Sequence, residues 1–380
     1  MSTIEVNKIA PVSGGTAVTI GDSGDTFTVT SGATFNASSS NLANRPNAKP
    51  IIINGNCAVA QRNTSVSSLT SSGAVQTVDR IKNEIGSIGT YTVAQESLSS
   101  GNAYNNGFRK AWRIDTTTAD ASPAAGDSLY VTYHFEGQDL QLFKKGTSNA
   151  EKFTLAFWVK SKKTGTGQVN LRDNDNSRLI GGTYTISVAD TWEHKVVNFA
   201  ADTTGAFDND NAGSMDIEWW LDSGTTYSSG TTPTAWEAFS QADRNASGTL
   251  QIARDTANDW AITGIQLEVG EYTSATIPPF QHESFGDNLQ RCQRYCFHST
   301  DGHTSLFVYQ DGSSYLQGNA FYPATMRAAP TGTFSFSAGA GTISSSGASN
   351  IGVSAAIIYA NMSGANGRVT CTSQKWTAEL

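Results

Sequence analysis

The stretch from Trp260 to Ser299 constrains the fold most, because its hydrophobic period changes once, in the middle. From Thr263 to Val269 apolar and polar residues alternate, which is the two-residue period of a half-buried strand. After Pro278-Pro279, Ser284 can cap a helix with one apolar stripe, which consists of Phe285, Leu289, Cys292 and Cys296. The change of period predicts a domain junction, where a short surface helix lies against a sheet.

The rest of the chain has an all-β composition. Its 380 residues include 36 glycines and only 15% are charged, a mixture that favours short strands joined by tight turns. Clean alternation predicts strands at 129–136, 153–160 and 215–222. Many such strands predict a central antiparallel jelly-roll sandwich over residues 50–285.

Residues 286–380 are predicted to hold the short junction helix and a small C-terminal β-sandwich domain. Strands are expected at 306–309, 315–322, 333–336, 353–359 and 369–373, whereas the Gly/Ser-rich residues 337–349 are expected to form turns.

Residues 1–49 are predicted to form an N-terminal β arm. Its short strands, such as Val18–Ile20 and Phe27–Val29, offer two apolar residues each. The burial of two apolar residues per strand cannot offset the entropy lost when the backbone is ordered. Other chains should therefore stabilise the arm. A flexible leader is the alternative.

Several segments carry a family resemblance. GIQLEVG (264–270) and ESFGDNLQRCQRY (283–295) resemble a segment that recurs in bacteriophage tail-fibre and other virion structural proteins, where it closes a jelly roll. Two weaker echoes are IIINGNCAVAQRNTS (51–65), which has Cys57 and Ala60 where aromatics are more usual, and MRAAPT (326–331).

The resemblance implies a role and partners. It implies a tail-fibre protein of the virion, assembled in the host cytoplasm as a homotrimer. Residues 1–49 would attach it to a tail adaptor, nozzle or baseplate. Its β domains would contact host polysaccharide or lipopolysaccharide, and the jelly roll would be similar to those of carbohydrate-binding modules.

Two tryptophans are the candidates for glycan binding. Alternation places Trp219 in the core and Trp220 outside, beside Asp216 and Glu218, and it places Trp158 outside on another strand. An outward aromatic plane next to carboxylates matches the apolar face and the hydroxyl groups of a sugar ring. Packing of these tryptophans against a neighbouring subunit, or beneath the loop 223–239, explains them equally.

Other classes of function are disfavoured. A net charge of −8 opposes nucleic-acid binding, and no 18-residue apolar run or signal peptide suggests membrane insertion. No catalytic motif is present, so we expect neither an enzyme nor a cofactor.

No metal is expected either. The acidic loops 172–178 and 207–213 fit turns better than calcium loops, because Ala212 and Trp219 occupy positions where ligands would stand. The cysteines are expected to be reduced core residues, and these are Cys57, Cys292, Cys296 and Cys371.

Three hypotheses follow for the function. The first is a virion fibre protein that recognises the host surface. The second is a glycan hydrolase or its binding module, and the third is a purely structural decoration subunit of the virion.

Overall fold

The computed structural model describes residues 49–380, except for 249, 301–303, 307–314, 340 and 364–368. The predicted arm over residues 1–49 therefore lies outside the described residues, apart from Lys49. The described part is all-β, as predicted, with antiparallel sheets arranged as sandwiches. None of its helices is both long and apolar enough to cross a membrane.

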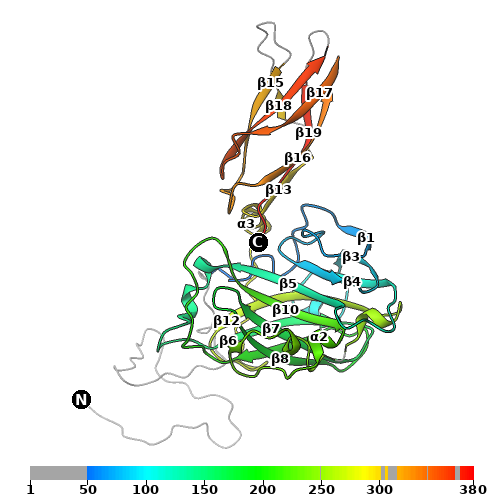
Figure 1. The fold of residues 1–380 in the computed structure, drawn as a ribbon, viewed down its shortest axis with the longest axis vertical. Coiled ribbons are helices and arrows are strands. Elements are labelled where there is room, and N and C mark those ends of the chain that lie inside the picture. Colours follow the sequence, from blue (N-terminus) through cyan, green and yellow to red (C-terminus); the bar gives the residue numbers. More distant parts are fainter. Residues whose placement is uncertain (1–48, 249, 301–303, 307–314, 340, 364–368) are drawn as a thin grey trace, which may run out of the picture. The chain divides into compact units, whose positions relative to one another are not determined.

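Two six-stranded antiparallel sheets build the main domain (Figure 1). One sheet has the order β1 (Ser65–Leu69), β3 (Thr90–Ser97), β4 (Lys110–Thr118), β12 (Asp259–Val269), β6 (Phe153–Lys160) and β9 (Glu193–Phe199). The other has the order β11 (Glu237–Ala238), β8 (Arg178–Ile186), β7 (Gly165–Asp173), β10 (Gly213–Ser223), β5 (Ser128–Glu136) and β2 (Lys82–Gly86). The three strands predicted by alternation are β5, β6 and β10.

The core lies between these two sheets. The rings of Phe157 on β6 and Trp219 on β10 meet edge to face, 5.9 Å apart, and both side chains are fully buried. Trp112 and Trp260 pack in the same cluster from β4 and β12. Trp219 thus points into the core, as its position in the alternating strand predicts.

Short helical turns connect the strands of the jelly roll. Two are single α-turns, α1 (Asn102–Asn105) and α2 (Thr225–Ser228). Four are 3-10 turns, η2 (Gly137–Asp139), η3 (Gln141–Phe143), η4 (Gln241–Asp243) and η5 (Ile252–Arg254).

The predicted junction helix is α3 (Phe285–Gln293), which begins directly after Ser284. The Ser284 hydroxyl accepts a hydrogen bond from the backbone N–H of Asp287 at 3.2 Å, which confirms the predicted cap. The predicted apolar stripe holds for Cys292, which is buried, but fails for Phe285, which is 61% exposed. Phe285 is the first helical residue, and Asn288 is buried in its place.

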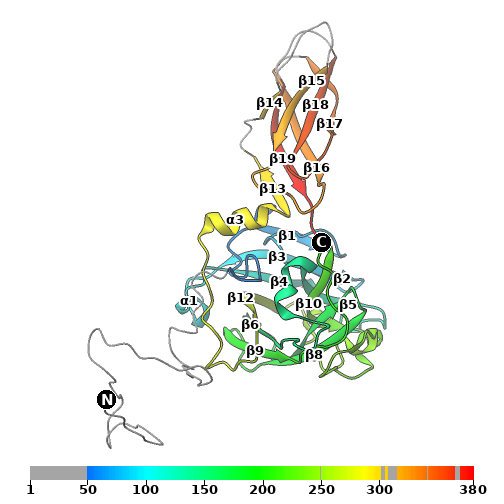
Figure 2. The ribbon, with the colours of Figure 1, turned by 90° about the vertical axis from the view of Figure 1, so that its left-hand side faces the viewer.

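A second sandwich follows α3, and its described residues form seven strands (Figure 2). One sheet has the order β13 (Cys296–Ser299), β19 (Val369–Thr377) and β14 (Thr304–Leu306), with β16 (Thr331–Ala338) also paired to β19. The other has the order β15 (Tyr315–Phe321), β18 (Ala355–Ser363) and β17 (Thr342–Ser349). Leu316, Ile358 and Trp376 lie in the core of this domain.

The prediction of turns over residues 337–349 is wrong, because most of this segment forms β17. Ile343 and Ala348 pack against the core, and the backbone pairs with β18. The many serines and glycines are the small residues of a strand rather than of turns. The strand predicted at 306–309 is represented only by the end of β14, since residues 307–309 lie outside the described residues.

Candidate functional site

The predicted aromatic platform on β10 is not exposed. Asp216, Glu218 and Trp220 do share the face of β10 opposite to Trp219, but Trp220 has no accessible surface. Tyr130 of β5 stacks on its ring, with centroids 4.4 Å apart, and Tyr227 of α2 lies 5.1 Å away. The prediction of an open platform is therefore wrong. The alternative of a covering loop holds in part, because Tyr227 of the loop 223–239 covers Trp220 together with Tyr130 and with Arg244, which lies beyond that loop.

The two carboxylates beside Trp220 are also occupied. Glu218 forms an ion pair with Arg244 at 2.7 Å and accepts a hydrogen bond from Trp220 Nε1 at 3.0 Å. The Arg244 guanidinium lies 4.6 Å from the centre of the Trp220 ring, which adds a cation–π contact. A sugar could bind these groups only by displacing the residues that already hold them.

Asp216 is held in the same way. Its carboxylate contacts His134 Nδ1 at 2.5 Å and accepts a hydrogen bond from Asn174 at 3.0 Å. Burial alone would raise the pKa of Asp216, but His134 and Asn174 outweigh that effect and hold the pKa below its usual range. The group stays ionised as part of a satisfied polar layer.

Trp158 does not join Trp220, because it lies on β6 in the other sheet. It is half-buried and packs at 5.0 Å against the ring of His194, whose pKa burial and the nearby Lys195 lower. Phe108 and Trp192 complete a small cluster there. The structure therefore splits the predicted site between two faces of the sandwich.

The segments that carry the family resemblance meet around α3. Asn288 donates hydrogen bonds at 3.2 Å to the side-chain oxygens of Asn54 and Asn56, which belong to the segment 51–65. The backbone N–H of Arg327, from the segment 326–331, donates to the carbonyl of Arg294 at 2.9 Å. These motif residues thus form the joint between the chain's opening segment, α3 and the second sandwich.

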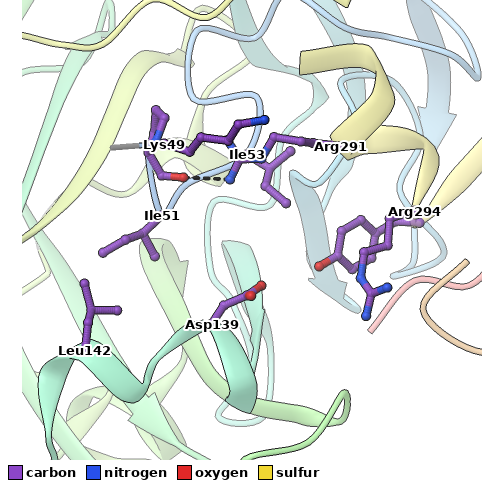
Figure 3. A pocket seen from close by; sticks show the side chains of 9 residues that line it. Lys49, Ile51, Ile53, Asp139, Leu142, Arg291 and Arg294 are labelled. Carbon is purple, nitrogen blue, oxygen red and sulfur yellow. Dashed lines mark hydrogen bonds between the residues drawn. The ribbon is translucent and has the colours of Figure 1, made fainter. Parts of the chain in front are cut away.

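A cavity of about 370 Å³ opens beside this joint (Figure 3). Three segments line it: the opening of the described chain, the η2–η3 corner after β5, and α3 with the two residues that follow it. The lining residues are Lys49, Pro50, Ile51, Ile53, Asp139, Leu142, Arg291, Arg294 and Tyr295. Its volume lies within the range of about 300–1,000 Å³ that is typical of ligand pockets.

Both arginines of this pocket are matched by carboxylates. Arg294 binds Glu136 through two hydrogen bonds, of 2.7 and 2.6 Å. Burial opposes ionisation of Glu136, but the bonds from Arg294 and Tyr295 outweigh it and lower its pKa. Arg291 pairs with Glu283 at 2.8 Å and donates to the carbonyl of Pro50 at 2.6 Å. This second bond links α3 to the opening segment of the described chain at the edge of the pocket.

One cation and one anion remain available in the pocket. Among the described residues, neither Lys49 nor Asp139 has an ion-pair partner within 4.0 Å. Burial and the charge of Glu136 raise the pKa of Asp139. Figure 3 shows Ile51 and Leu142 on one side of the pocket, Arg294 on the other and Asp139 between them. The pocket thus combines an apolar wall with one strong donor and one strong acceptor.

Sequence reasoning missed this pocket. Its residues come from three segments that are more than 80 positions apart in the chain, and none of them forms a recognisable spacing. The one available signal was on α3, where Arg291 and Arg294 fall off the apolar stripe.

The other candidate residues have structural roles. All four cysteines are buried free thiols, and burial raises the pKa of Cys57 and of Cys296 to about 12. In the loop 172–178, the Asp173 carboxylate accepts a hydrogen bond from the backbone N–H of Asn176 at 3.0 Å, as a turn residue does. Within the described ranges no three His, Cys, Asp or Glu side chains cluster as metal ligands would.

No protein-family model and no curated protein sequence matches the chain. Solved structures are similar at low TM-scores and include a phage tailspike domain and several carbohydrate-binding modules. The enzymatically active domain of tailspike protein 4 of bacteriophage CBA120 is 12% identical over 58% of this chain, with a TM-score of 0.29. The chain spans only about a fifth of that domain's length, 21%.

Two smaller proteins are similar over almost their whole length. A putative sugar binding protein from Bacteroides thetaiotaomicron is 13% identical over 58% of this chain and 100% of its own, with a TM-score of 0.31. The family 11 carbohydrate-binding module from Clostridium thermocellum, solved with a β-1,3-1,4-mixed-linked tetrasaccharide, is 9% identical over 55% of this chain and 98% of its own, with a TM-score of 0.26. TM-scores this low carry no argument about function.

Proposed function

We propose that the chain is a virion structural protein of the tail-fibre type that binds an uncharged glycan of the host surface in the pocket beside α3. The observation that carries glycan binding is the lining of this pocket. Ile51 and Leu142 offer apolar contact to the C–H groups of a sugar ring, while Asp139 accepts from its hydroxyls and Lys49 donates to them.

The charge balance of the pocket favours an uncharged ligand. Glu136 and Glu283 match the two arginines, so Lys49 and Asp139 leave no net charge for an anion or a cation to neutralise. A hydroxyl group is both donor and acceptor, so a polyhydroxyl ring can satisfy both remaining groups at once.

The virion part of the proposal rests on the family resemblance. The resembling segments are far apart in the sequence yet bind one another around α3, which gives their shared occurrence a physical reason. We propose a homotrimer attached through residues 1–49 to a tail adaptor, nozzle or baseplate protein. Polysaccharide or lipopolysaccharide of the host would be its ligand.

We propose binding without hydrolysis. The carboxylates closest to the predicted aromatic platform are held in ion pairs with Arg244 and His134, and Asp139 is the one acid among the described residues that line the pocket. Glycoside hydrolysis commonly uses a pair of carboxyl groups that flank the bond to be cleaved. A hydrolase and a decoration subunit without glycan binding are the alternatives.

A panel of purified bacterial surface polysaccharides, neutral and uronic-acid-containing, tests the proposal with the full chain. We expect retention of at least one neutral polysaccharide and no release of reducing ends. Lys49→Ala and Asp139→Asn should each weaken retention, whereas Lys162→Ala and Asp190→Asn, at exposed positions outside the pocket, should not. Release of reducing ends would instead support the hydrolase, and no retention of any polysaccharide would support the decoration subunit.

A further inference from the structure

Among the described residues, the outer face of the sheet formed by β15, β18 and β17 carries apolar and neutral polar side chains only. Residues alternate along β15, and the register places their β18 and β17 partners beside them on the same face. We call this surface the uncharged face. It consists of Tyr315, Gln317, Asn319 and Phe321 of β15, Ala355, Ile357, Tyr359 and Asn361 of β18, and Ser345, Gly347 and Ser349 of β17.

Large apolar side chains are exposed on and beside this face. Phe321 is 73% exposed and Tyr315 is 40% exposed, and Ile351 and Val353 are exposed between β17 and β18. These are four of the seven large apolar side chains that are exposed in the described ranges. Such a concentration in one small domain indicates a surface that another molecule covers.

The scarcity of charge extends through the middle of this domain's sequence. Between Asp311 and Arg368, Arg327 is the only Asp, Glu, Lys or Arg residue. Its guanidinium donates to the carbonyls of Asn211, Ala378 and Glu379, so this charge is used at the joint with the jelly roll and not on the uncharged face. The whole chain, by contrast, has a net charge of −8.

The polar groups of the face are partly satisfied within it. The Asn361 side-chain amide donates to the Ser345 hydroxyl at 2.7 Å. The rings of Tyr315 and Tyr359 stack with centroids 5.6 Å apart. Covering the face therefore requires neither a counter-charge nor a full set of new hydrogen bonds.

We propose that the uncharged face packs against the uncharged faces of further copies of this chain. A partner that presents unpaired ions would lose their hydration here without compensation. The same face of another copy presents none, so it is complementary in charge and can repeat around a symmetry axis. The inference is independent of glycan binding, and it places a subunit contact in the C-terminal domain in addition to the arm over residues 1–49.

Thiol labelling of the full chain tests this contact locally. All four native cysteines are buried, so Asn319→Cys would supply an accessible thiol on β15, the strand at one edge of the face. Val188→Cys is the matched control, because Val188 is 56% exposed on the jelly roll. We expect a maleimide reagent to label Asn319→Cys at least tenfold more slowly than Val188→Cys, in a particle whose native mass is a multiple of 40.3 kDa.

A second substitution tests whether the contact that protects Asn319→Cys depends on the absence of charge from the uncharged face. Phe321→Lys adds a charge to the face at an exposed position, so it should restore rapid labelling of Asn319→Cys without changing that of Val188→Cys. Equal labelling of the two thiols in the parent chain would overturn the proposal. Protection of Asn319→Cys in a particle with the mass of a monomer would also overturn it, since the cover would then belong to the same chain. Neither outcome depends on whether the protein binds glycan.

Discussion

Single residues explain why an accurate strand prediction did not yield the site. Alternation correctly sent Trp219 and Trp220 to opposite faces of β10, because that depends only on the two-residue period of a strand. Whether the outer face meets solvent depends on Tyr227 and Arg244, which follow in a segment with no regular period. Their docking is a tertiary interaction that the sequence of β10 cannot reveal.

The burial of Trp220 changes the expected cost of its removal. An exposed tryptophan could be truncated at little cost, but Trp220→Ala should destabilise the protein by about 3–5 kcal/mol, as Trp219→Ala should. Urea unfolding of both variants measures these losses. A Trp220→Ala variant as stable as the parent would show that the loop does not cover this side chain.

Glu136 should make a pH-dependent contribution to stability. Its pKa is lowered in the folded state, so its stabilising effect is present above its ordinary pKa, near pH 4.5, and is lost as the pH falls through the folded-state value. The Glu136→Gln variant should be about 2–3 kcal/mol less stable than the parent at pH 7. Arg294 and Tyr295 would then lack the carboxylate to which they donate hydrogen bonds.

Unfolding of Glu136→Gln and the parent from pH 7 down to pH 3 tests this prediction. The difference in stability between the two proteins should shrink as the pH falls below about 4.5. A difference that stays constant over this range would contradict the ion pair.

At the scale of elements, the start and position of α3 were predicted correctly, but its buried face was predicted only in part. Its start followed from Ser284 and its position from the change of period. The apolar stripe failed at its first residue, because a helical side chain leans toward the N-terminus and Phe285 lies beyond the surface that the helix covers. Asn288 could not be predicted as buried, since its partners Asn54 and Asn56 lie more than 230 positions earlier.

Two substitutions in α3 should therefore differ in cost. Phe285→Ala, at an exposed site, should change stability by less than about 0.5 kcal/mol. Cys292→Asp would bury an additional carboxylate and should cost about 3–5 kcal/mol, because the nearby Arg80 and Arg291 already pair with Glu379 and Glu283. Similar midpoints of thermal unfolding for the two variants would show that the packing of α3 is described incorrectly.

At the scale of the whole molecule, the class of fold was predictable and the pocket was not. Composition and alternation fixed an antiparallel jelly roll because they depend on local periods and turn residues. The pocket needs Lys49, Asp139 and Arg291 side by side, and only the complete tertiary fold brings them together. β17 was missed for a related reason: its serines pair with β18, and that pairing has no signature within the segment.

Removal of residues 1–48 tests whether the N-terminal arm attaches the protein to the virion while the two β domains fold without it. The two β domains bury their own cores, so the shortened chain should fold with an unchanged unfolding midpoint. It should no longer join virions, because the predicted attachment arm is missing. Quantitative mass spectrometry of purified virions measures its occupancy, and normal occupancy would contradict the attachment role.

Calorimetric titration with a retained neutral polysaccharide tests the central claim most directly, because it decides which surface holds the sugar. The double variant Lys49→Ala/Asp139→Asn alters only the pocket, and Arg172→Ala alters the face of β7 beside Glu218. We predict that the pocket variant raises Kd at least tenfold, a loss of about 1.4 kcal/mol, while Arg172→Ala binds as the parent does. Unchanged binding by the pocket variant, together with weakened binding by Arg172→Ala, would contradict the assignment of the sugar to the pocket. It would instead indicate that the sugar binds to the outer face of the sheet that contains β7 and β10.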